Sequence, residues 1–176
     1  HLVNANRSGT NGVINVDGGF ENSQVATEDG DIGTNDYWYI GQPGHGYNFW
    51  KGYLDEIRVT NVVRSEDWIS TEYANQNSPD TFYTLDTEET TNPDWYSTDW
   101  NFRKEITIDN TQVDDDLVSF PVLINQDSDS ELAADAQIDA DDILFTDTNG
   151  YKLSHQIENY DSSDGSLRAW VKIPEL

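Results

Sequence analysis

The chain has 176 residues, of which 34 are Asp or Glu and nine are Lys or Arg, and its formal net charge is −25. A charge this negative repels nucleic acid and anionic membrane surfaces, which excludes both as partners. There is no Cys, so no disulfide can form. No apolar run approaches the roughly 20 residues of a membrane helix, so no membrane insertion is expected. The length allows one large domain or two small ones.

Two short strands are predicted near the N-terminus. Residues 12–16 alternate between apolar and polar, and the Asp-Gly-Gly at 17–19 favours a tight hairpin turn because glycine accepts a positive φ. The Tyr-Trp-Tyr-Ile-Gly at 37–41 reads as the second strand. Residues 22–35 and 42–48 are rich in turn-forming residues and are expected to be loops.

Residues 49–59, Phe-Trp-Lys-Gly-Tyr-Leu-Asp-Glu-Ile-Arg-Val, alternate with a period of two, which predicts a strand. Ser65 then has the character of a helix N-cap. Glu66 and Asp67 follow it in the first turn, where negative charge meets the positive end of the helix dipole. The apolar stripe of this predicted helix consists of Trp68, Ile69, Glu72 and Tyr73. Residues 82–85 are predicted to form a further strand.

Residues 86–94 contain no apolar side chain that could enter a core, and a linker is predicted over 87–94. Beyond it the chain is again rich in strand patterns, with Pro121 indicating an edge strand or a bulge. A capping box at 128–131 precedes a short predicted helix at 132–136. The predicted strands of this half cover 100–108, 118–124, 142–146, 153–160 and 167–173, with turns at 147–150 and 161–165.

The strand at 49–59 and the Arg-Ser-x-Asp-Trp-Ile-x-Thr-Glu-Tyr at 64–73 resemble, in order and spacing, the closing segment of laminin-G-like domains. The Gly-Thr and Val-Asp-Gly within 9–18 and the Ile-Gly at 40–41 are similar to further strands of that family. The resemblance implies the concanavalin-type jelly-roll fold, with a binding partner left open.

The second half resembles a β-rich domain of unknown function that is common in secreted or surface proteins of bacteria and archaea. Four blocks carry the resemblance: Trp-x-Phe-Arg-Lys-x-Ile-Thr-Ile at 100–108, Phe-Pro-Val-Leu-Ile at 120–124, Asp-Asp-Ile-Leu-Phe-Thr-Asp at 141–147 and Leu-x-Ala-Trp-Val-Lys-Ile-Pro at 167–174. In those proteins the domain commonly alternates with laminin-G-like modules.

These resemblances imply a laminin-G-like portion at 1–86, a linker at 87–94 and the N-terminal portion of a β-sandwich domain at 95–176. We therefore expect an all-β protein with two β-sandwich, jelly-roll-like units and two short helices. The chain is expected to run from the middle of one module to the middle of the next.

No catalytic residue is predicted. Asp55 and Glu56 are adjacent on a predicted strand and should point to opposite faces, whereas paired carboxyls need to lie roughly 5–10 Å apart across one cleft. Jelly-roll glycosidases resemble a Glu-x-Asp-x-x-Glu strand, and Arg58 stands here where the Asp should be. We expect Glu56 to pair with Arg58 or Lys51 instead.

Loop carboxylates suit calcium, which takes 6–8 oxygen ligands. Two clusters could hold such an ion, and solvated acid is the alternative for both. The candidate metal ligands are Asp29, Asp31 and Asp36 in one cluster and Asp139, Asp141 and Asp142 in the other.

Aromatic side chains at loop edges could stack on sugars, although aromatics in strands are more often core or cross-strand pairs. The candidate glycan-binding residues are Trp38, Tyr47 and Trp50.

The leading hypothesis is an extracellular, non-enzymatic adhesion or structural module of a cell-surface or filament-forming protein. Its partners are expected to be identical copies or neighbouring modules, joined by strand exchange at the strands near Val13 and Trp170. The alternative is a carbohydrate-binding accessory module of a secreted polysaccharide-degrading enzyme. A glycosidase of the jelly-roll type is a weaker third hypothesis.

Overall fold

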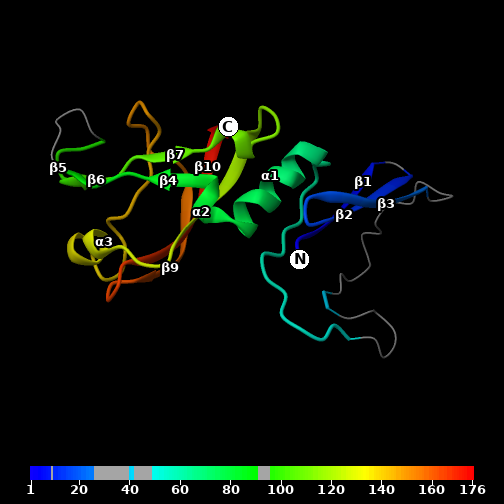
Figure 1. Ribbon diagram of the computed structural model, residues 1–176, viewed down its shortest axis with the longest axis horizontal. Helices are drawn as coiled ribbons and strands as arrows, with labels where there is room; N and C mark the ends of the chain where they lie inside the picture. The colour runs from blue at the N-terminus through cyan, green and yellow to red at the C-terminus, as the bar shows by residue number, and fades with distance from the viewer. Residues whose placement is uncertain (9, 26–39, 42–48, 91–95) are drawn as a thin grey trace.

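The computed structural model describes residues 1–8, 10–25, 40–41, 49–90 and 96–176 (Figure 1). Over these residues the fold is all-β, with strands in several antiparallel sheets and only short helices. The strands are β1 Val3–Ser8, β2 Asn11–Val16, β3 Gly19–Val25, β4 Tyr83–Leu85, β5 Glu89–Thr90, β6 Phe102–Arg103, β7 Ile106–Ile108, β8 Val118–Gln126, β9 His155–Asp161 and β10 Ser166–Glu175. The helices are α1 Glu66–Asn77, α2 Pro79–Phe82, α3 Ser130–Asp135 and the 3-10 helix η1 Asn110–Gln112.

The N-terminal sheet is the meander β1-β2-β3. Asp17 and Gly18, with φ values of 53° and 78°, form its second turn, as the Asp-Gly pair predicted. A Cβ on Gly18 would lie 3.2 Å from the Cα of Ser70, so this turn abuts α1 closely. β3 runs to Val25, so residues 22–25 of the loop predicted at 22–35 are strand instead, and the rest of that prediction lies outside the described residues.

Helix α1 begins where the sequence predicted. The Ser65 hydroxyl accepts a hydrogen bond from the Trp68 amide, and the helix buries Trp68 and Ile69. It lies between the N-terminal sheet and β8 (Figure 1). The prediction of two helices missed α2. Pro79, expected only to end α1, occupies the first turn of a new helix, where its missing N–H costs nothing.

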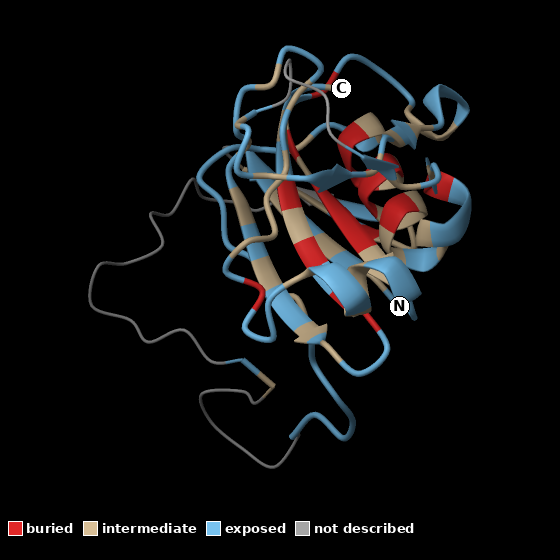
Figure 2. Ribbon diagram, turned by 90° about the vertical axis from the view of Figure 1, so that its left-hand side faces the viewer, coloured by how far each residue is buried: buried red, intermediate tan, exposed pale blue. Residues whose placement is uncertain are grey.

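The main sheet has the order β8-β10-β9, and its inner face is apolar. Alternation puts Phe120, Val122 and Ile124 of β8 on one face, opposite Ile173, Val171 and Ala169 of β10. Along β10 buried positions alternate with half-buried or exposed ones, whereas β8 buries Phe120 and the three consecutive residues 122–124 (Figure 2). The turn at 161–165 and the strands predicted at 118–124, 153–160 and 167–173 are thereby confirmed.

A single buried core contains residues from both sides of the predicted linker at 87–94. Trp68 and Phe82 share a buried cluster with Phe120 and Val122, and the ring centroids of Trp68 and Phe120 are 4.7 Å apart. Strand β4 pairs with β7, and β5, inside the predicted linker, pairs with β6. The boundary at 87–94 stays a prediction, but the described packing joins the residues on its two sides.

The outer edge of β8 is covered by side chains. The Asn75 carboxamide accepts from the Leu123 amide at 2.7 Å and donates to the Leu123 carbonyl at 3.1 Å. The Tyr83 hydroxyl makes the same two bonds with Asn125. These two side chains occupy the positions of a neighbouring strand, so this edge cannot pair there with another chain. Pro121 lies on this edge strand, as predicted.

Residues 49–59 are not a strand, contrary to the prediction. No described strand pairs with them, and Glu56 has a φ of 50°, which breaks the extended backbone. An alternating pattern makes a strand only where a partner is at hand. Val13 and Trp170 lie on β2 and β10, which are central strands of their sheets, so the expected pairing of another chain at these strands is wrong.

Three smaller predictions also need correction. The strand predicted at 100–108 is split into β6 and β7. The one predicted at 142–146 keeps only a single bridge, because the Asp142 carbonyl accepts from the Trp100 indole instead of a strand. The cap of α3 is Asp129 rather than Ser128, since the Asp129 carboxylate accepts from two amides of the first turn.

Trp68 ties α1 to the core, so truncating it tests the docking of this helix. Trp68→Ala should lower the free energy of unfolding by about 3–5 kcal/mol, as expected for a buried aromatic. Urea unfolding measures the change, and Tyr151→Ala, at a 72% exposed position, is the control. A loss below about 1 kcal/mol, typical of surface sites, would show that α1 is not docked.

Candidate functional site

The described part of residues 1–63 exposes apolar side chains and buries none. The large exposed hydrophobic residues of this part are Val3, Ile14, Phe20, Ile40, Phe49, Trp50, Tyr53, Leu54, Ile57, Val59, Val62 and Val63. Every buried hydrophobic residue among those described comes from Trp68 onward. We call residues 49–63 the crossing segment, because they lead from the N-terminal part to α1 (Figure 1).

Arg58 anchors the crossing segment to the rest of the protein. One guanidinium nitrogen donates to Glu72 of α1 at 2.6 Å and the other donates to Glu56 at 2.9 Å. The guanidinium carbon also lies 4.1 Å from the ring centroid of Trp170 on β10. The Glu56–Arg58 pair expected from the sequence is thereby confirmed. Arg58 joins the crossing segment, α1 and the main sheet at one point.

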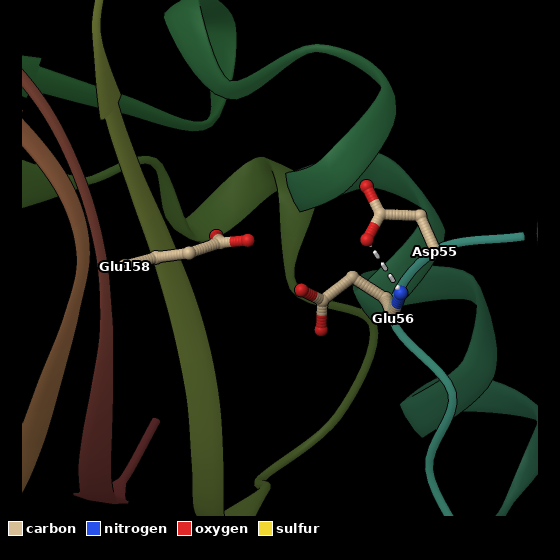
Figure 3. Close-up of side chains that lie close together, drawn as sticks. All are labelled: Asp55, Glu56 and Glu158. Atoms are coloured by element: carbon tan, nitrogen blue, oxygen red, sulfur yellow. Dashed lines mark hydrogen bonds between the residues drawn. The ribbon is translucent and has the colours of Figure 1, made fainter.

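Three carboxylates converge beside this anchor. Asp55 and Glu56 come from the crossing segment and Glu158 from β9, and one oxygen of each lies within 4.8 Å of the others (Figure 3). Asp55 and Glu158 are exposed and Glu56 is half-buried. Carboxylate oxygens at this spacing can hold a hard cation. A bound ion would offset the mutual repulsion of the three charges and would link the crossing segment to β9.

Burying the carboxyl group of Glu72 in this arrangement costs free energy. Burial raises the pKa of its carboxyl above the ordinary value, and the charge and hydrogen bond of Arg58 offset this rise only in part. The negative charge of Glu56 adds to the rise. The ion pair therefore positions Arg58 without repaying all of the desolvation of Glu72.

The structure describes some of the candidate glycan-binding and metal-ligand residues and not others. Trp38, Tyr47, Asp29, Asp31 and Asp36 lie outside the described residues. Trp50 is described and 59% exposed, as a stacking platform requires.

The second acidic cluster is described but its carboxylates do not gather as the triad does. Asp139 and Asp142 each accept a hydrogen bond from a nearby backbone amide, of Asp141 and Gln137 respectively. A calcium site at Asp139, Asp141 and Asp142 stays a prediction.

Sequence reasoning weighed Asp55 and Glu56 as a catalytic pair and expected an ion pair at Glu56, but it considered neither as a metal ligand and it missed Glu158. On a strand the side chains of Asp55 and Glu56 would point to opposite faces. In the structure the irregular backbone at Glu56 brings both towards β9. No spacing rule links Glu158 to residues so distant in the chain. The strand pattern at 153–160 was the only available signal, because it places alternate residues on one face.

No family model, no curated protein and no solved structure matches this chain. No helix among the described residues combines the length and the apolarity needed to cross a membrane.

The raised pKa of Glu72 predicts a pH dependence of stability. The folded state binds this proton more tightly than the unfolded state, so the contribution is full below the ordinary pKa of 4.5 and is lost as pH rises through the folded pKa. Glu72→Gln removes the titration, so its stability relative to the wild type should increase between about pH 4 and about pH 7.

Urea unfolding of both proteins at the two pH values measures this, with the exposed Glu105→Gln as the control. If Glu72→Gln instead loses stability relative to the wild type at the higher pH, the ion pair with Arg58 outweighs the burial cost.

Proposed function

We propose that this chain is a non-enzymatic structural or adhesive module of an extracellular assembly, and that it associates with neighbouring copies through the apolar side chains of residues 3–63. The observation that carries the proposal is the uneven division of apolar surface. The described residues before α1 hold twelve of the seventeen large exposed hydrophobic residues and no buried one. A concentration of exposed apolar side chains in one part of a soluble protein is what an interaction site presents.

The N-terminal sheet also offers edge strands, as the main sheet does with β9 at its far edge. The middle of the β8 edge is closed by Asn75 and Tyr83, whereas β1 and β3 are edge strands of the N-terminal sheet. A further strand can add to such an edge. The apolar side chains of the crossing segment lie in the same half of the chain, so strand addition and apolar contact would act together.

The net negative charge of the chain makes this association depend on salt concentration. Two copies with a formal charge of −25 repel each other, and salt screens that repulsion. The crossing segment and the residue after it contain three of the nine basic residues, Lys51, Arg58 and Arg64, against two acidic ones, Asp55 and Glu56, so this stretch carries less negative charge than the chain as a whole. The extracellular setting comes from the resemblance to modules of secreted and surface proteins.

Glycan binding is the second candidate function, and the exposed Trp50 is the observation that favours it. An exposed indole offers an apolar platform for the face of a sugar ring. Binding on a glycan array that disappears in Trp50→Ala, while association between copies persists, would support this candidate over the first.

Calcium is the cation that we propose for Asp55, Glu56 and Glu158. The donor set is oxygen only, which suits a hard ion, and water would complete the 6–8 ligands that calcium takes. Its role would be to hold the crossing segment against β9.

Association between copies can be measured by sedimentation. The average mass of the wild type should rise with concentration, and more steeply in about 1 M salt than in about 0.15 M, because the Debye length falls from about 8 to 3 Å. Tyr53→Ser combined with Val59→Ser should reduce the association, since both positions are more than two-thirds exposed.

Ile138→Ser, at an 84% exposed position outside this surface, is the matched control and should associate as the wild type does. A wild type that stays monomeric at high salt and high concentration would contradict the proposal.

The calcium site predicts a chelator effect. Adding EDTA at fixed ionic strength should lower the melting temperature of the calcium-loaded protein, because an ion bound only to the folded state stabilises it. Glu158→Gln should abolish the shift, and the exposed Glu175→Gln, which makes the same change in charge, should keep it. An equal shift in both variants would place the ion elsewhere.

A further inference from the structure

A cavity of about 450 Å³ lies on the half of the protein away from the N-terminal sheet, among β4, β6, β7, β8, β10 and α3. This volume is within the range of about 300–1,000 Å³ that is usual for ligand sites. Its wall is mainly apolar, and most of the apolar side chains that form it are half-buried or buried. They include Leu85, Ile106, Ile124, Leu132, Phe145 and Leu167.

Five of the ten polar or charged residues around this cavity are acidic and two are basic. Carboxylates of Glu88, Asp99, Asp129, Asp135 and Asp142 contribute to its lining. The two basic residues of the lining are already neutralised. Arg103 pairs with Glu89 at 2.6 Å, and Lys104 pairs with Asp129 at 2.6 Å and with Glu131 at 2.8 Å. The cavity therefore combines an apolar wall with an excess of negative charge.

The raised pKa of Glu88 reflects its burial and this excess of negative charge. Burial raises the pKa of its carboxyl, and the negative charges of Asp135 and Glu131 raise it further, while Lys104 opposes them. Like charges this close favour a bound cation, because the cation offsets their repulsion. The same charges would repel an anionic ligand.

An aromatic side chain is fixed beside the acidic residues. The Trp100 indole N–H donates to the Asp142 carbonyl at 2.7 Å, and Tyr96 packs edge-on against the ring with a centroid distance of 5.3 Å. Both contacts hold the orientation of the Trp100 ring. The face of an indole attracts cations, which adds to the effect of the carboxylates.

We propose that this cavity binds a small organic cation, an ammonium group carried on a compact apolar body. The apolar part would fill the space lined by Leu132, Phe145 and Leu167, and the ammonium group would lie near Glu88, Asp135 and the Trp100 ring. A hydroxyl-rich ligand fits less well, because much of it would lie against the apolar side chains of the wall. The lining contains none of the described residues of 3–63, so failure of this proposal would leave the proposed function untouched.

A series of probes that differ in charge tests the proposal. Phenethylammonium, 2-phenylethanol and phenylacetate share one shape and carry a positive, zero and negative charge. Calorimetric titration of the wild type should give the tightest binding for phenethylammonium, weaker binding for the alcohol and none for the acid. Equal binding of all three, preference for phenylacetate, or no binding of phenethylammonium would overturn the proposal.

Variants locate the binding. Glu88→Gln combined with Asp135→Asn should weaken phenethylammonium binding about three- to tenfold per carboxylate and leave 2-phenylethanol unchanged. Asp139→Asn, an exposed acidic residue outside the lining, is the matched control and should have no effect. Loss of binding in the control and not in the double variant would place the site elsewhere and overturn the proposal.

A last comparison distinguishes the sources of such a cation. A blocked dipeptide of Phe and Lys presents the same ammonium group on a polypeptide. Tighter binding of the dipeptide would support a lysine side chain of a partner as the ligand, and tighter binding of phenethylammonium would support a free amine. Chemical shifts confined to the amides of β6, β7 and α3 should accompany either result, and shifts confined to the N-terminal sheet would overturn the proposal.

Discussion

The docking of α1 onto β8 is the contact on which the rest of the structure depends. Trp68 packs on Phe120 in the core, and the carboxamide of Asn75 satisfies the backbone of Leu123 at the edge of the sheet. An unpaired buried peptide group would cost about 1–3 kcal/mol, so the polar contact adds to the apolar one in fixing the position of the helix. With α1 in place, one side of the helix completes the core and the other supports the N-terminal part.

The N-terminal part depends on this support. Its sheet touches α1 through the turn at Gly18, and Asn6 donates to the Arg64 carbonyl just before the helix. The buried Asn15 and its cross-strand neighbour Asn4 have side-chain atoms with no hydrogen-bond partner among the described residues. Without an apolar core of its own, this part gains little from folding alone, which makes it the natural place for a partner to bind.

The sequence predicted those elements whose signals are local. The Ser65 cap and the Asp-Gly turn act within a few residues, and β8, β9 and β10 have long alternating patterns. Residues 49–59 have an equally good strand pattern, but a strand needs a neighbour, and Arg58 instead meets Glu72 and Trp170. The acidic triad and the cavity both join residues that are distant in the chain, so no spacing in the sequence could reveal them.

Hydrogen exchange of the intact chain tests the central claim, that the N-terminal sheet has little stability of its own. β2 and β10 are both central strands of three-stranded sheets, so their amides form a matched pair. In dilute solution the amides of β2 should exchange about a hundredfold faster than those of β10, through opening of the N-terminal part alone. Protection of β2 should rise as copies associate, while that of β10 should stay constant. Equal protection of the two strands in the monomer would contradict the account.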